Sequence, residues 1–216
     1  FDLVKETLNW EARETEFISL SNEFRSKSYY DCIIPVSGGK DSYFQAHIIT
    51  KEFNLKPLLV TYNGNNYLPE GEKNRDKMKE VFDADHIMWG PSVEVLKKLN
   101  RIAFKKMGDM NWQNHCGIFT SPIIVAAKFG IPLIIWGEIL WDISGMFDPE
   151  DTVEFTAKTR HEHMIRGFEW YDFLNDPKRL PITASRYKFV GKMFEKFNNV
   201  LEIGSGDGFK SLIVGD

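Results

Sequence analysis

The chain has 216 residues and a formal net charge of -4, with hydrophobic residues at 43% and aromatic residues at 14% of positions. This composition is typical of a folded globular protein, and its acidic balance gives no overall attraction to nucleic acid or to an anionic membrane. No apolar run approaches the ~18 residues of a membrane span, and the two cysteines, Cys32 and Cys116, suit a reducing compartment. We therefore expect a cytoplasmic protein with no membrane and no nucleic-acid partner.

Helices and strands are predicted to alternate along the chain. Apolar residues at helical spacing, with Pro or Gly at several ends, predict helices over residues 1–28, 41–53, 70–82, 91–108, 120–130 and 149–174. Short apolar runs that end at turns predict buried strands over 31–36, 56–62, 84–89 and 131–136. This alternation predicts an α/β fold with a doubly wound parallel sheet. Ligands of such sheets bind beyond the carboxyl ends of the strands, so we expect a site formed by the loops 37–42, 63–69, the loop opening at Gly90, and 137–148.

The pattern changes near residue 176. We expect a first domain over residues 1–175 and a linker over 176–184, where two prolines and several charges gather. Residues 185–216 then predict the beginning of a second α/β domain: a helix over 185–197, a strand, a glycine-rich turn and the start of another helix. Because the chain begins with Phe1 and stops soon after this turn, we interpret it as a piece of a longer protein.

The sequence SGGKDS, at residues 37–42, lies between a predicted strand and a predicted helix. Two glycines let the backbone approach a ligand, and the amides at the start of the helix form an anion site. The other four residues supply a mobile cation, two hydroxyls and a carboxylate: Lys40, Ser37, Ser42 and Asp41. The spacing differs from the Walker A pattern. We interpret it as a polyphosphate-binding loop, the alternative being a tight strand–helix turn with a surface lysine.

All six residues match the signature of the PP-loop ATP pyrophosphatases, which the chain therefore resembles. The resemblance implies a Rossmann-like fold of the adenine nucleotide alpha hydrolase type, with ATP and Mg²⁺ as cofactors. It also implies that ATP is cleaved between its α- and β-phosphates. A substrate oxygen is then adenylated, pyrophosphate leaves, and a nucleophile displaces AMP.

Within this superfamily the chain resembles the N-acetyl sugar amidotransferases, through the segments 59–66, 82–87, 108–123 and 131–138. This resemblance implies that a nucleotide-activated N-acetyl sugar is the substrate, in bacterial surface-polysaccharide biosynthesis. Adenylation of the acetamido oxygen would create a leaving group, and ammonia would displace it to give an acetamidino sugar. A separate glutaminase subunit is the implied source of ammonia.

The resemblance also implies roles for individual residues. The catalytic residues would be Lys40, Asp41 and Glu138. ATP would contact Ser37, Gly38, Gly39, Lys40, Asp41, Ser42, Thr61, Tyr62 and Asn63, and substrate would contact Asn111, His115 and Gly117. Glu138 and Asp142 would share Mg²⁺, which takes few protein carboxylates together with phosphate oxygens. The alternatives are ordinary strand-end residues at 61–63, a surface loop histidine at 115, and a solvated loop acid at 142.

The segment VLEIGSGDGF, at residues 200–209, resembles the first motif of class I S-adenosylmethionine-dependent methyltransferases. The matching residues are Glu202, Gly204, Gly206 and Gly208. The resemblance implies S-adenosylmethionine as a cofactor for a complete C-terminal domain only, since the usual acidic partner of the ribose would lie beyond residue 216.

Other functions stay open at this point. A PP-loop enzyme that modifies tRNA, by thiolation or by lysidine-type chemistry, would have a basic face and usually catalytic cysteines. Another ATP-dependent amide-forming synthetase, or a nucleotide-binding module without activity, would share the phosphate loop.

Overall fold

The computed structural model describes residues 9–26, 28–137, 161, 165–168, 172, 199–203 and 210–214. Its helices are α2 (Trp10–Phe24), α3 (Lys40–His47), α4 (Pro69–Phe82), α5 (Val93–Met107) and α6 (Trp112–Phe129), and a short π-helix, η1 (Ile48–Glu52), continues α3. These elements confirm the predicted helices up to residue 130. The predicted helix 185–197 lies outside the described residues. The helix predicted over 149–174 is wrong at 165–168, where Arg166 and Gly167 have positive φ angles that an α-helix does not allow.

The central sheet consists of β1 (Cys32–Pro35), β2 (Pro57–Tyr62) and β3 (His86–Trp89), in the order β1-β2-β3. All pairs are parallel, with Ile33 opposite Leu58 and Leu59 opposite His86. The predicted fourth strand lies on the other side of β1, where Ile134 forms a parallel bridge with Ile33. The chain therefore winds outward from β1 in both directions, which confirms a doubly wound α/β fold.

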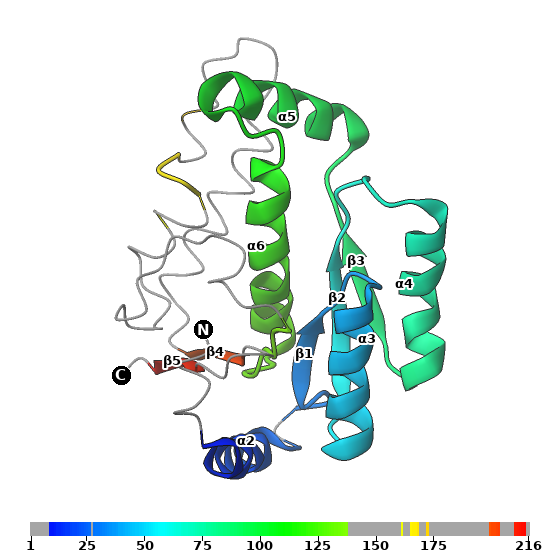
Figure 1. The fold of residues 1–216 in the computed structure, drawn as a ribbon, viewed down its shortest axis with the longest axis vertical. Coiled ribbons are helices and arrows are strands. Elements are labelled where there is room, and N and C mark those ends of the chain that lie inside the picture. Colours follow the sequence, from blue (N-terminus) through cyan, green and yellow to red (C-terminus); the bar gives the residue numbers. More distant parts are fainter. Residues whose placement is uncertain are drawn as a thin grey trace.

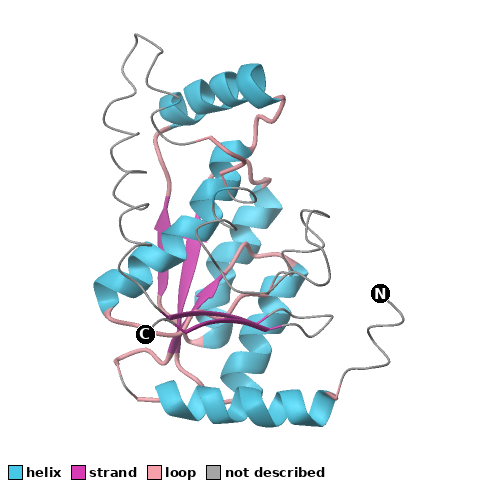
Figure 2. Cartoon of the chain, turned by 90° about the vertical axis from the view of Figure 1, so that its left-hand side faces the viewer, coloured by secondary structure: helices cyan, strands magenta, loops and turns pink. Residues whose placement is uncertain are grey.

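Helices cover both faces of this sheet, with α6 on one face and α3 and α4 on the other (Figure 1). The alternation of side chains along β1 explains this, because Ile33 packs toward α6 while Cys32 and Ile34 pack toward α3. Figure 2 shows the parallel strands with their arrowheads toward the end of the molecule at which α5 lies. The loops that follow the strands therefore gather at that end.

Helix α6 begins earlier than the sequence predicts. The predicted helix 120–130 has Pro122 near its start, whereas in the structure Pro122 lies inside α6, which begins at Trp112. A proline in a helix leaves a carbonyl of the preceding turn without its amide donor. Just before Pro122, the hydroxyls of Thr120 and Ser121 donate to carbonyls one turn earlier, and this local bonding accompanies the continued helix.

The described part of the C-terminal region is a two-stranded antiparallel sheet of β4 (Asn199–Ile203) and β5 (Lys210–Val214). The strand predicted at 199 is confirmed. The helix expected after the glycine-rich turn is wrong at 210–214, because these residues pair with β4 along its whole length. Among the residues that the structure describes, no helix is long and apolar enough to cross a membrane.

Candidate functional site

The loop that joins β1 to α3 has the geometry of an anion site. Gly38 has a φ of +83°, a conformation that side chains rarely adopt, and Gly39 is the N-cap of α3. No side chain caps α3, so the first amides of this helix stay available to a ligand. The Ser37 amide donates to Ser42 Oγ at 2.9 Å and the two hydroxyls lie 3.1 Å apart, which fixes the loop.

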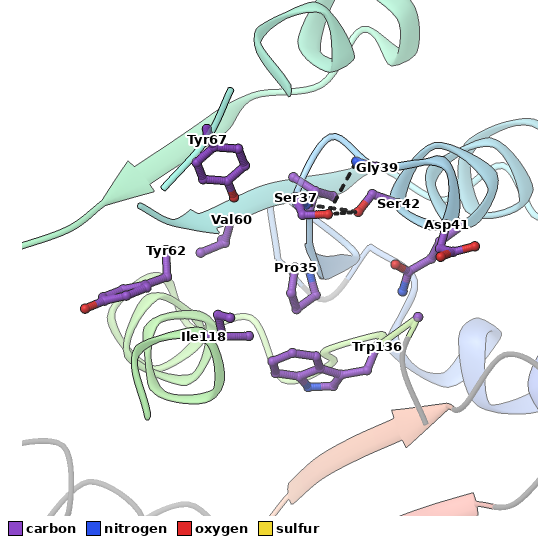
Figure 3. A pocket seen from close by; sticks show the side chains of 13 residues that line it. Pro35, Ser37, Gly39, Asp41, Ser42, Val60, Tyr62, Tyr67, Ile118 and Trp136 are labelled. Atoms are coloured by element: carbon purple, nitrogen blue, oxygen red, sulfur yellow. Dashed lines mark hydrogen bonds between the residues drawn. The ribbon is translucent and has the colours of Figure 1, made fainter. Parts of the chain in front are cut away.

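This loop forms one side of an open pocket. In Figure 3 the rings of Tyr62, Tyr67 and Trp136 lie around the opening, and Ser37 and Ser42 lie on the remaining side. The residues that line the pocket are Pro35, Val36, Ser37, Gly39, Asp41, Ser42, Gln45, Val60, Tyr62, Tyr67, Ile118, Trp136 and Gly137. Such a combination of aromatic walls and a polar, anion-binding end suits a nucleotide.

The pocket lies where the strand order reverses. Pro35 ends β1, and Trp136 and Gly137 follow Ile134, which pairs with the opposite side of β1. The Gln45 side chain joins the two sides, since its Nε2 donates to the Ile135 carbonyl at 2.7 Å. This is the position at which doubly wound sheets bind ligands, as the sequence predicts.

Two predicted catalytic residues lie at the rim. The Lys40 side chain is 90% exposed and does not line the pocket, and its ammonium contacts Asp41 Oδ1 at 2.7 Å. Asp41 does line the pocket, in the first turn of α3. An exposed lysine is free to reorient, so Lys40 can exchange Asp41 for a ligand phosphate at little cost.

The residues at the end of β2 separate into different environments. Tyr62 lines the pocket, whereas Thr61 points away from it, where its hydroxyl donates to the Val36 carbonyl at 2.6 Å. Asn63 does not line the pocket, and its Oδ1 accepts from the Asn65 amide at 2.9 Å. Of the three predicted contacts at the end of β2, the structure thus brings only Tyr62 to the pocket with the phosphate loop.

The predicted substrate residues lie on α6, beside the pocket. Asn111 is the exposed N-cap of this helix, His115 is half-buried, and Gly117 is buried beneath the Tyr62 ring. None of the three lines the pocket. A buried polar chain connects the two regions: Tyr62 Oη donates to Gln113 Oε1 at 2.7 Å, and Gln113 Nε2 donates to Asn114 Oδ1 at 2.6 Å.

The other predicted site residues cannot be placed. Glu138 and Asp142 lie outside the described residues, as do Gly204, Gly206 and Gly208, and Glu202 is described only as part of β4. Among the described residues, no three acidic, His or Cys side chains form a metal cluster. Asp41 is the single carboxylate among the described pocket-lining residues, which suits Mg²⁺ held mainly by phosphate oxygens.

Burial disfavours the charged forms of two histidines and a cysteine. Desolvation, assisted by the Arg75 guanidinium, lowers the pKa of His86 from 6.5 to about 4, and desolvation also lowers the pKa of His115. Burial raises the pKa of the Cys32 thiol, so this cysteine is unreactive. His86 Nε2 lies 2.9 Å from Thr61 Oγ1, behind the phosphate loop.

Sequence reasoning missed several residues of the pocket. Gln45 and Ile118 line it without an obvious signal in the sequence. Tyr67 also lines it, and it belongs to the loop 63–69 that we expected at the site, although the residue itself was not singled out. Trp136 forms one wall of the pocket. The signal available for Trp136 and Gly137 was their position at the carboxyl end of a predicted strand.

The fold and the site together define a doubly wound α/β protein with an anion-binding loop at the reversal of strand order. No family model matches the chain, and no curated protein matches it.

Three solved structures are similar in fold. The match to an NMN synthetase from Francisella tularensis has 12% identity and a TM-score of 0.47, and covers 65% of this chain and 59% of that one. The match to an NH3-dependent NAD synthetase from Campylobacter jejuni, in complex with nitrate, has 11% identity and a TM-score of 0.45. It covers 88% of this chain and 96% of that one. The match to a U34-tRNA thiolase from Methanococcus maripaludis, with its [4Fe-4S] cluster, has 15% identity and a TM-score of 0.40. It covers 86% of this chain and 64% of that one.

Proposed function

We propose that the chain is an ATP-dependent amidotransferase of the PP-loop ATP pyrophosphatase type, which adenylates the acetamido oxygen of an N-acetyl sugar precursor. Ammonia then displaces AMP to give an acetamidino sugar. The observation that carries the nucleotide part is the uncapped N-terminus of α3, with its glycine loop, at the polar end of a pocket with aromatic walls. The sugar part is supported by the sequence segments that resemble sugar amidotransferases.

The proposed reaction must convert the amide carbonyl of the acetamido group, a poor electrophile, into a reactive one. An amide carbonyl resists ammonia, and transfer of AMP to its oxygen supplies a leaving group. The chain's own contribution is to hold the phosphates and neutralise their developing charge, through the α3 amides, the Ser37 and Ser42 hydroxyls and Lys40. Bound Mg²⁺ would add further charge neutralisation at the phosphates, with Asp41 as its protein ligand.

The test measures AMP and pyrophosphate release with candidate sugars. We expect release from ATP only when both a nucleotide-linked N-acetyl sugar and an amine donor are present. Free ammonium at raised pH should replace a glutaminase, because unprotonated ammonia is the nucleophile. If ammonium fails while a sulfur donor supports product, the amidotransferase proposal is wrong and a thiolation enzyme takes its place.

A second candidate, an RNA-modifying enzyme, is favoured by one observation. Helix α5 carries the exposed basic residues Lys97, Arg101, Lys105 and Lys106, which could contact phosphates of an RNA. Against thiolation, both cysteines of the chain, Cys32 and Cys116, are buried. Binding of tRNA that weakens steeply with salt, and that is lost in an Arg101→Glu variant, would favour this candidate.

A further inference from the structure

One buried cation near the pocket is incompletely paired. Arg75, on α4, is 3% exposed. Its Nε and Nη2 both lie 3.2 Å from one oxygen of the neighbouring Asp76, whose side chain is 59% exposed. Its Nη1 is buried and has no hydrogen-bond partner among the described residues.

Arg75 lies against the phosphate loop. A Cβ built on Gly38 would be 2.6 Å from the Arg75 amide nitrogen, so the backbone of α4 packs directly on this glycine. The guanidinium lies over the ring of Tyr67, 4.8 Å from its centre. Tyr67 lines the pocket, and so do Ser37 and Gly39 on either side of Gly38. The backbone of Arg75 therefore lies against the loop, and its guanidinium lies against the ring of one aromatic wall.

The burial of this charge needs a physical explanation. A buried cation is costly unless it is paired and hydrogen-bonded, and a buried donor without a partner adds to that cost. Asp76 offsets only part of the cost of burying this charge, because its carboxylate is exposed to water. One carboxylate oxygen accepts both hydrogen bonds, each at 3.2 Å. An arginine stacked on a ring is also rigid, and its planar fork suits a phosphate group.

We propose that Arg75 Nη1 donates to an oxygen of the β,γ-diphosphate end of ATP, and holds pyrophosphate after cleavage. This inference rests on the proposed function, because it assigns one end of the same nucleotide. Lys40 then acts as the mobile charge at the rim, and Arg75 as the fixed charge behind the loop. Arg75 does not line the pocket and its Nη1 is buried, so the distal phosphates contact this group only when the Tyr67 ring moves aside on ligand binding.

The experiment compares pyrophosphate and AMP binding to the full chain by calorimetry. We expect Arg75→Met and Arg75→Lys to weaken pyrophosphate binding by about tenfold or more, because a charged hydrogen bond is lost. AMP binding should stay within about twofold, since the lost contact is worth little to a ligand that lacks the distal phosphates. Lys73→Met, which removes an exposed cation from the same helix, is the matched control and should change neither.

Folding is checked by thermal unfolding without ligand. Arg75→Met should melt no lower than the wild type, because it removes a buried and incompletely paired charge. If this variant does not fold, pyrophosphate binding by Arg75→Lys tests the inference, because this variant keeps the positive charge and loses the planar guanidinium.

Two outcomes would overturn the inference. If the wild type binds pyrophosphate and the folded Arg75 variants bind it equally well, the assignment of Arg75 is wrong and the proposed function stands. If the wild type binds neither ATP nor pyrophosphate, both the inference and the proposed function fail.

Discussion

Lys40 and Arg75 show how position decides what a basic residue can do. Lys40 is exposed and contacts only the adjacent Asp41, so its folded-state contacts contribute little to stability. Arg75 is buried, with its backbone against Gly38 and its guanidinium over the Tyr67 ring, so its position is set by packing. The sequence singled out the first residue and not the second.

The first prediction concerns Lys40. Lys40→Ala should lower the rate of AMP formation by about 100-fold or more, because the lysine neutralises charge that develops on the phosphates. The free energy of unfolding should change by less than about 0.5 kcal/mol, as for other exposed side chains. A matched Lys51→Ala variant, which removes an exposed lysine from η1, should keep wild-type activity. AMP formation by Lys40→Ala at the wild-type rate would contradict the assignment of the loop.

His86 links stability to pH. Its pKa falls from 6.5 to about 4 in the folded protein, mainly through burial. The unfolded chain therefore binds this proton at higher pH than the folded chain does. The stabilisation is fully present above pH 6.5 and is lost as the pH falls toward 4.

The second prediction follows from the direction of this pKa shift. The free energy of unfolding of the wild type should decrease as the pH falls from about 7 to about 5, a window in which most carboxylates stay ionised. In His86→Gln this decrease should be smaller, because a glutamine can still donate to Thr61 without titrating. The pKa of His115 is also lowered in the folded protein, so this residue should account for part of the decrease that remains in His86→Gln. Denaturant titrations at both pH values measure the free energy of unfolding of each protein. An equal decrease with pH in the wild type and in His86→Gln would refute the role of His86.

At the scale of elements, α6 and β2 meet at one glycine. Gly117 lies so close to the Tyr62 ring that a Cβ at this position would overlap it. Tyr62 is in turn held by Gln113, a fully buried residue one turn earlier on α6. The close approach of this helix to the strand therefore fixes one aromatic wall of the pocket.

The third prediction concerns this contact. Gly117→Ala should destabilise the fold by about 1–3 kcal/mol, the usual cost of overpacking a core. It should also weaken ATP binding, because the Tyr62 ring must move. Gly71→Ala on α4 is the control, since its Cβ would make only an ordinary contact and alanine favours a helix. Combining Gly117→Ala with Tyr62→Leu should recover stability, whereas additive losses would mean that the two residues do not clash.

The strands and the phosphate loop were predictable because their signals are local. Apolar runs such as 31–36 and adjacent glycines identify a buried strand and a turn wherever they lie. The burial of Arg75 was not predictable, since its sequence neighbours are charged and its packing on Gly38 depends on a distant segment. The start of α6 was also missed, because Pro122 mimics a helix start and tertiary packing overrides that local signal.

At the scale of the whole molecule, the doubly wound sheet brings distant segments to one pocket. The loop after β1 and the segment that contains Trp136 and Gly137 meet because the chain crosses from one side of β1 to the other. The C-terminal β4 and β5 form a separate two-stranded sheet, with Asn199 opposite Val214 and Ile203 opposite Lys210.

The last prediction concerns this C-terminal sheet. In the methyltransferase motif that the segment 200–209 resembles, a helix is expected to follow the glycine-rich turn against which the cofactor would lie. Here Lys210–Val214 pairs with β4 instead, so that helix start is missing from this position. We therefore expect no saturable binding of S-adenosylmethionine to the 216-residue chain, up to millimolar concentrations. Calorimetry measures this, with ATP binding by the same sample as the control that the protein is folded. Saturable binding that S-adenosylhomocysteine displaces would show that the glycine-rich turn forms a cofactor site despite the pairing of β4 with β5.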